Sequence, residues 1–271
     1  IYDNQQYSPG NMGDKYSLQP VTLRDALVHS LNVITVDVAM EVTIGRVMNL
    51  AAKAGLPRVP RAYPAMALGT AGFTAGMAIV RMEQNGLTPT SGKVIVSGAT
   101  GGVGSIAVDA LSRLGYHVVA LTGKESETAY LQGLGAKEVM LRQSIDLSKI
   151  RPLDKALWAG AVDNLGGDVL AWMLSGMQLC GSVASIGLAA NMNLPTTVAP
   201  FILRGVNLLG IDSVNCPRPL RQEVWRRLAS DMRPAHLKTM AHTVAFDQLP
   251  TVFADIIDAK AKGRTVIDIA A

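Results

Sequence analysis

The chain has 271 residues, of which 49% are hydrophobic and 17% charged, and its formal net charge is +4. This composition predicts a globular protein with a large core in one or two domains, and the mild charge argues against a nucleic-acid-binding surface. The sequence contains no run of about 18 apolar residues, so it predicts no membrane span. Two cysteines are too few for a metal cluster, and we expect a reduced, cytoplasmic protein without metal.

The first 64 residues show helical patterns and no strand pattern. Residues 1–20 are polar and rich in turn formers, which predicts a loop. Thr22 has the character of an N-cap, with Asp25 in the capping-box position three residues later. Apolar residues at helical spacing then cover residues 23–39 and 44–54. We therefore expect a small helical segment over residues 1–64.

A glycine-rich turn in the middle of the chain organises the sequence around it. Apolar, β-branched residues at 94–96 predict a buried strand, a helical pattern covers residues 106–114, and residues 118–121 predict a second buried strand. The first strand and the helix are joined by a turn containing Gly98, Gly101, Gly102 and Gly104. Strand, glycine turn, helix and strand form the βαβ unit of a dinucleotide-binding fold, in which N–H groups at the helix start face a pyrophosphate.

Strand and helix patterns continue to alternate as far as the C-terminus. We expect further strands at residues 138–141, 159–163, 181–187, 206–211 and 265–269, and helices near residues 130–134, 168–177, 221–230 and 249–262. This alternation predicts an α/β fold with a doubly wound parallel (Rossmann) sheet, preceded by the small helical segment. Ligands of such sheets bind beyond the carboxyl ends of the strands.

The end of the second strand bears on the choice of cofactor. NAD sites usually carry an acidic residue there, whereas this strand ends in Thr122, Gly123 and Lys124. A hydroxyl group and a cation suit a 2′-phosphate, so we expect NADP(H), with Arg142 after the third strand as a second phosphate contact. A solvated loop lysine at Lys124 and a role for Arg142 unrelated to the cofactor remain alternatives.

Further cofactor contacts are expected at the glycine turn and at two later strand ends. The turn residues are Thr100, Gly101, Gly102 and Val103, and the strand-end residues are Asn164, Gly187 and Leu188. Ordinary strand-ending chemistry is the alternative for the last three residues. We assign no catalytic residue.

From about residue 65 onward, several motifs agree in order and spacing with one known family. They are SGATGGVGS, ALTGKESE, YLQGLGAKEV, WAGAVDNLGG, LPTTVAPFILRGVNLLGIDS and GRTVIDI. This part resembles the zinc-independent medium-chain reductases of the acrylyl-CoA reductase group, which includes quinone oxidoreductases. The resemblance implies that residues 65–271 are an NADP-binding Rossmann domain with a C-terminal return segment. It also implies hydride transfer from NADPH to an enoyl-CoA, enone or quinone, with a small-molecule substrate and no nucleic-acid or membrane partner.

That family carries its substrate-side groups mainly on an N-terminal catalytic barrel, and we expect this barrel to be missing here. We therefore expect NADPH binding with weak or no turnover. A reductase and a non-catalytic NADP-binding module both remain open as functions.

The first 70 residues instead resemble the transpeptidase domain of class A penicillin-binding proteins. The stretches YSPGN, VTLRDALVHSLN and VDVAMEVTIGRVMNLAAKAGL carry this resemblance. That family needs a Ser-x-x-Lys nucleophile and a Lys-Thr-Gly strand, and the sequence contains neither. We therefore expect a chimera with a junction near residues 65–70 and no acylating activity.

The apolar strand at residues 206–211 is expected at an edge of the sheet. An exposed edge of this kind pairs readily across a two-fold axis. The sequence therefore predicts a homodimer formed through this strand.

Overall fold

The structure, a computed structural model, describes residues 65–268. The helices expected at residues 23–39 and 44–54, and the segment that resembles a penicillin-binding protein, lie outside the described residues. The chain divides into two units between Tyr63 and Pro64, and the described residues belong to the second unit.

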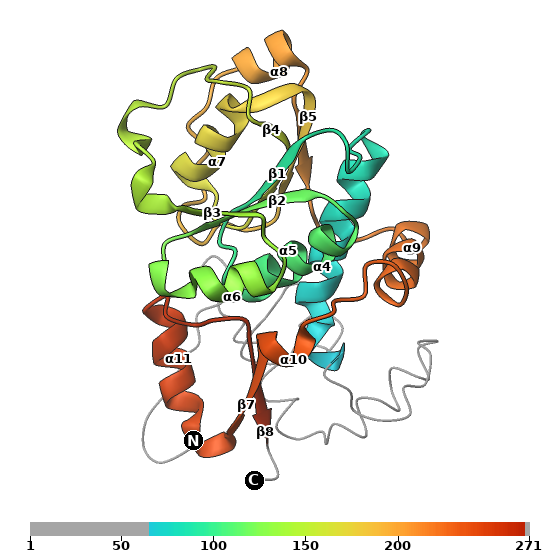
Figure 1. The fold of residues 1–271 in the computed structure, drawn as a ribbon, viewed down its shortest axis with the longest axis vertical. Helices are drawn as coiled ribbons and strands as arrows, with labels where there is room; N and C mark the ends of the chain where they lie inside the picture. The colour runs from blue at the N-terminus through green and yellow to red at the C-terminus, as the bar shows by residue number, and fades with distance from the viewer. Residues whose placement is uncertain (1–64, 269–271) are drawn as a thin grey trace, which may run out of the picture. The chain divides into compact units, whose positions relative to one another are not determined.

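Six parallel strands form the central sheet, in the order β3-β2-β1-β4-β5-β6 (Figure 1). The strands are β1 (Lys93–Val96), β2 (His117–Thr122), β3 (Glu138–Leu141), β4 (Trp158–Asp163), β5 (Met177–Ser185) and β6 (Asn207–Gly210). The order reverses between β1 and β4, as in the dinucleotide-binding sheet. The predicted doubly wound Rossmann fold is confirmed.

Alternate residues of the inner strands supply two hydrophobic cores, one on each face of the sheet. Val94 and Val96 belong to the core beneath α4 (Ala65–Gln84) and α5 (Gly102–Arg113). Ile95, between them, belongs to the opposite core, together with residues of α7 (Gly167–Ser175). This period of two along a strand that is buried on both faces explains why β1 reads as a continuous apolar run.

The remaining helices are short and follow the sheet strands. They are α6 (Thr128–Gly133), α8 (Ala199–Arg204), α9 (Arg218–Leu228), α10 (Leu237–Met240) and α11 (Leu249–Ile257), with 3₁₀ turns at Glu125–Glu127, Arg142–Ser144, Leu147–Lys149 and Phe246–Gln248. Within residues 65–268 no helix is both long and apolar enough to cross a membrane.

A second sheet holds two parallel strands, β7 (Ala241–Ala245) and β8 (Arg264–Asp268). The sequence predicted the C-terminal strand but not its partner β7. Two predicted helix ends also need correction. The helix expected at 168–177 ends at Ser175, because Gly176 caps it and Met177 begins β5. The helix expected at 249–262 ends at Ile257, and the left-handed conformation of Ala259 (φ 55°) redirects the chain.

Candidate dinucleotide-binding site

The glycine turn after β1 is shaped by close backbone contacts. Gly98 has a φ of 57°, and the N–H of Gly101 donates to its carbonyl oxygen at 3.0 Å. A methyl group at Gly104 would lie 2.3 Å from that same oxygen, so only glycine lets α5 pack this closely on the turn. Helix α5 begins at Gly102, and its N-cap, Gly101, supplies no side-chain cap to the first N–H groups. This is the arrangement that binds anions at helix starts.

Residues 261–264, here called the C-terminal strap, lie against this turn. The N–H of Gly263 donates to the carbonyl oxygen of Thr100 at 2.8 Å. A methyl group at Gly102 would lie 2.7 Å from Cδ of Arg264 and 3.2 Å from its Nη1. The space beside Gly102 is therefore bounded by a guanidinium side chain. The sequence did not predict this neighbour, since the two residues lie far apart in the chain.

The predicted phosphate contacts Thr122, Lys124 and Arg142 meet at the end of β2. Thr122 is buried, and its Oγ1 accepts from the N–H of Lys124 at 3.0 Å. A methyl group on the intervening Gly123 would lie 3.8 Å from Nε of Arg142, which places that exposed guanidinium over the turn. The Nζ of Lys124 donates to the carbonyl oxygen of Ala261 at 2.6 Å.

Burial and neighbouring charges set the protonation of Lys124. Burial lowers the pKa of its ammonium group, the nearby carboxylate of Glu127 acts in the opposite direction, and the charge of Lys262 lowers the pKa further. The end of β2 is therefore a partly desolvated site in which the cations Lys124 and Lys262 lie close enough to interact.

A buried carboxylate holds the next strand end in place. Asp163, at the end of β4, has no exposed surface and accepts from Ser97 Oγ (2.8 Å), Leu165 N (3.1 Å) and Gly166 N (2.9 Å). Burial raises the pKa of this carboxyl group, and the three hydrogen bonds oppose that shift. The network fixes the turn that begins at Asn164.

The predicted contacts Asn164 and Gly187 lie side by side. The Nδ2 of Asn164 donates to the carbonyl oxygen of Ser97 at 2.7 Å. A methyl group at Gly187 would lie 2.4 Å from the carbonyl oxygen of Asn164, so a side chain at position 187 is excluded. Leu188 comes next, with its side chain 55% exposed. Val103 differs from these residues, because its partly buried side chain packs against the core.

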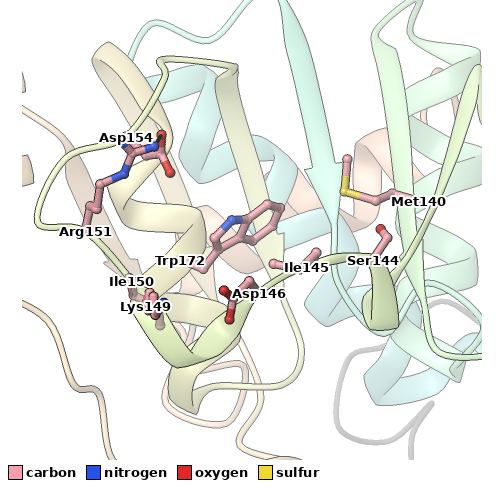
Figure 2. Close-up of a pocket in the computed structure, with 9 residues that line it drawn as sticks. All are labelled: Met140, Ser144, Ile145, Asp146, Lys149, Ile150, Arg151, Asp154 and Trp172. Atoms are coloured by element: carbon pink, nitrogen blue, oxygen red, sulfur yellow. Dashed lines mark hydrogen bonds and ion pairs between the residues drawn. The ribbon is translucent and has the colours of Figure 1, made fainter.

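A separate hollow lies between the loop after β3 and helix α7 (Figure 2). Its lining includes Met140, Ile145, Trp172, Asp146 and Arg151. None of the ten predicted cofactor contacts lines it. The residues predicted from the sequence lie at or after the carboxyl ends of β1, β2, β3, β4 and β5.

In the described part of the chain, no group of three or more His, Cys, Asp or Glu side chains is placed to hold a metal ion. Cys180 is exposed, Cys216 is buried, and neither forms a disulfide.

The arrangement fits a dinucleotide. A glycine turn with uncapped helix N–H groups and a neighbouring guanidinium suits a pyrophosphate, and the hydroxyl and cations at the end of β2 suit a phosphorylated ribose. The chemistry of the donors is therefore consistent with the cofactor that the sequence predicts.

Comparison with known proteins gives consistent matches for this part of the chain. Residues 102–230 match the family model described as zinc-binding dehydrogenase. The acrylyl-CoA reductase AcuI of Ruegeria pomeroyi is 47% identical over 205 residues, which are 76% of this chain and 62% of that protein.

Two crystal structures extend the similarity to the fold. The yhdH oxidoreductase of Salmonella enterica in complex with NADP has a TM-score of 0.72 at 45% identity, over 76% of this chain and 63% of that one. The Bacillus subtilis protein yhfP with NAD bound has a TM-score of 0.72 at 48% identity, over 76% of this chain and 63% of that one. The chain thus spans somewhat less than two thirds of these relatives. In sequence and in fold, its described part is a Rossmann domain similar to the zinc-binding dehydrogenases and their oxidoreductase relatives.

Proposed function

We propose that the described domain binds NADP(H) and serves an oxidoreductase that reduces an α,β-unsaturated acyl-CoA, an enone or a quinone. The observation that carries the proposal is the convergence of Thr122, Lys124 and Arg142 at the end of β2, where NAD-specific sites carry an acid. The similarity to an acrylyl-CoA reductase and to a crystal structure containing NADP supports it.

Each part of the site has a defined task in this proposal. The first N–H groups of α5 and the guanidinium of Arg264 bind the pyrophosphate, while Lys124, Arg142 and Thr122 bind the 2′-phosphate. Asn164, Gly187 and Leu188 orient the nicotinamide end. The bound nicotinamide supplies the hydride, and the residues of this chain bind and position it.

A second candidate function is a binding module without catalysis. The chain spans 62% of the acrylyl-CoA reductase that it matches, and we assign a catalytic role to none of the candidate site residues. Assays of NADPH oxidation with acrylyl-CoA and with a quinone separate the two candidates, since the module would support neither reaction.

Fluorescence titration with NADPH and NADH tests the cofactor assignment directly. We expect NADPH to bind at least about 10-fold more tightly, because its 2′-phosphate gains charge-assisted hydrogen bonds. Lys124→Ala and Arg142→Ala should remove most of this preference. Arg151→Ala is the matched control, since Arg151 pairs with Asp154 outside the site. Equal or tighter binding of NADH by the unaltered chain would overturn the assignment.

We further propose that the domain forms a homodimer through β6. This strand is the last in the order of the six-stranded sheet, where it pairs with β5, and Leu208 is exposed on it. Helix α8, which precedes β6, also exposes Ile202 and Leu203. A sheet edge beside apolar side chains is a favourable place for a second copy to pair.

A further inference from the structure

The C-terminal strap is attached to both halves of the candidate cofactor site. The N–H of Gly263 donates to Thr100 in the glycine turn, and the carbonyl oxygen of Ala261 accepts from Lys124 at the end of β2. The second contact joins residues 137 positions apart. Lys262, which lies between these two anchors, is therefore held close to the end of β2.

Two further contacts fix the Lys262 side chain. Its Nζ lies 3.0 Å from Oε2 of Glu127 and 5.2 Å from the centroid of the Tyr130 ring. Tyr130 is itself anchored, because its hydroxyl donates to Oγ of Ser105 on α5 at 2.9 Å. The Lys262 side chain is nevertheless 45% exposed, so its ammonium group remains accessible to an anionic ligand.

The ion pair between Glu127 and Lys262 affects the charge that a ligand meets near the end of β2. Glu127 and Lys262 both influence the titration of Lys124, so the three charges are close enough to interact. A carboxylate near the end of β2 disfavours a phosphate and favours an unmodified ribose. When paired with Lys262, Glu127 contributes little net negative charge there.

We propose that Lys262 is a specificity-determining residue that adds a third cation for the 2′-phosphate and masks the carboxylate of Glu127. This inference rests on the proposed NADP(H) binding and adds a residue from the opposite end of the domain. It makes the strap part of the cofactor site rather than only a connection to β8.

Isothermal titration calorimetry tests the proposal by measuring how tightly the full chain binds NADPH, NADH, 2′,5′-ADP and 5′-AMP. Lys262→Gln should weaken NADPH and 2′,5′-ADP about 10-fold, because one cation is lost and one carboxylate exposed. NADH and 5′-AMP should change by less than about twofold, since neither carries the 2′-phosphate. Lys260→Gln is the matched control, because Lys260 lies on the same loop and pairs with Asp258. It should leave all four affinities unchanged.

A second variant isolates the masking effect. In Glu127→Gln/Lys262→Gln the loss of NADPH affinity should be smaller than in Lys262→Gln alone, because no carboxylate is left exposed. Equal losses for NADPH and NADH in Lys262→Gln, or identical behaviour of Lys262→Gln and Lys260→Gln, would overturn the inference alone. Failure of the unaltered chain to bind both NADPH and 2′,5′-ADP would overturn the proposed function together with it.

Discussion

Gly104 shows how a single missing side chain determines the geometry of the site. A Cβ there would lie 2.3 Å from the carbonyl oxygen of Gly98 and 2.8 Å from Cα of Ala99, and both are backbone atoms that cannot rotate away. We expect Gly104→Ala to lower the free energy of unfolding by about 2–4 kcal/mol, because α5 must move off the turn. Urea denaturation measures this change.

Gly133 on α6 provides the control for that substitution. A methyl group at Gly133 meets nothing within 4 Å, so Gly133→Ala should be neutral or stabilise by up to about 1 kcal/mol through helix propensity. Equal effects of the two substitutions would contradict the close packing of α5 on the turn.

The buried carboxyl of Asp163 predicts a pH-dependent stability difference. Its folded-state pKa is raised by burial, so the unaltered chain loses stability as pH rises from the unfolded pKa through the higher folded one. Asp163→Asn lacks this titration. Its amide NH2 group would face the N–H of Gly166, donor against donor, and this should lower the unfolding free energy by about 1–3 kcal/mol.

The difference in unfolding free energy between the unaltered chain and Asp163→Asn should therefore be larger near about pH 4 than near about pH 8. Denaturation of both proteins at the two pH values measures it, and contributions from other groups cancel in the difference. A difference that grows with pH would show that hydrogen bonding, rather than burial, dominates the titration of Asp163.

The candidate site residues that could be proposed from the sequence are those whose neighbours along the chain also point to a cofactor. Thr122, which ends β2, is followed directly by a glycine and a lysine, and Arg142 follows the neighbouring strand. The strap residues Ala261 and Arg264 reach the site from far along the chain, and neither residue type indicates this by itself. Gly263 is the strap residue whose type carries structural information, because its φ of 56° is a left-handed conformation that glycine favours.

Among the elements, strand β4 was easier to predict from the sequence than strand β7. Strand β4 is buried at every position, and its apolar run was readable. Strand β7 has no fully buried residue and includes His242 and Thr243, so it lacks both the continuous apolar run and a clear alternation. Helices α8 and α10, with six and four residues, are too short for a helical period to be visible.

An ion pair between helices α4 and α9 predicts a stability effect at the scale of elements. The guanidinium of Arg227 is 13% exposed and pairs with Glu83 on α4 and with Asp231 at 2.7 Å. Arg227→Met should lower the unfolding free energy by about 1–3 kcal/mol, because Glu83 is left partly buried without its cation. Arg226→Met is the matched control, since Arg226 is exposed and pairs along its own helix with Glu223, and it should behave like the unaltered chain.

For the whole molecule, the proposed pairing of β6 with a second copy predicts a dimer in solution. Analytical ultracentrifugation should give twice the chain mass for the unaltered protein and the chain mass for Leu208→Arg, because a buried arginine at the pairing edge would lack a partner. Ile256→Arg, on the exposed face of α11, should remain dimeric. A monomeric unaltered protein, or a Leu208→Arg dimer, would contradict the assignment of this interface.

The strap affects how readily a protease can cleave the protein. Together with the residue before it, the strap holds two lysines and an arginine within five positions, Lys260, Lys262 and Arg264, all suitable for a trypsin-like protease. One cut there would break the covalent link between the strap and the rest of the domain, and would weaken the strap's contacts with Lys124 and Thr100. Bound nucleotide would hold the strap in place and so protect its peptide bonds from the protease. Those same peptide bonds keep the strap at the nucleotide site.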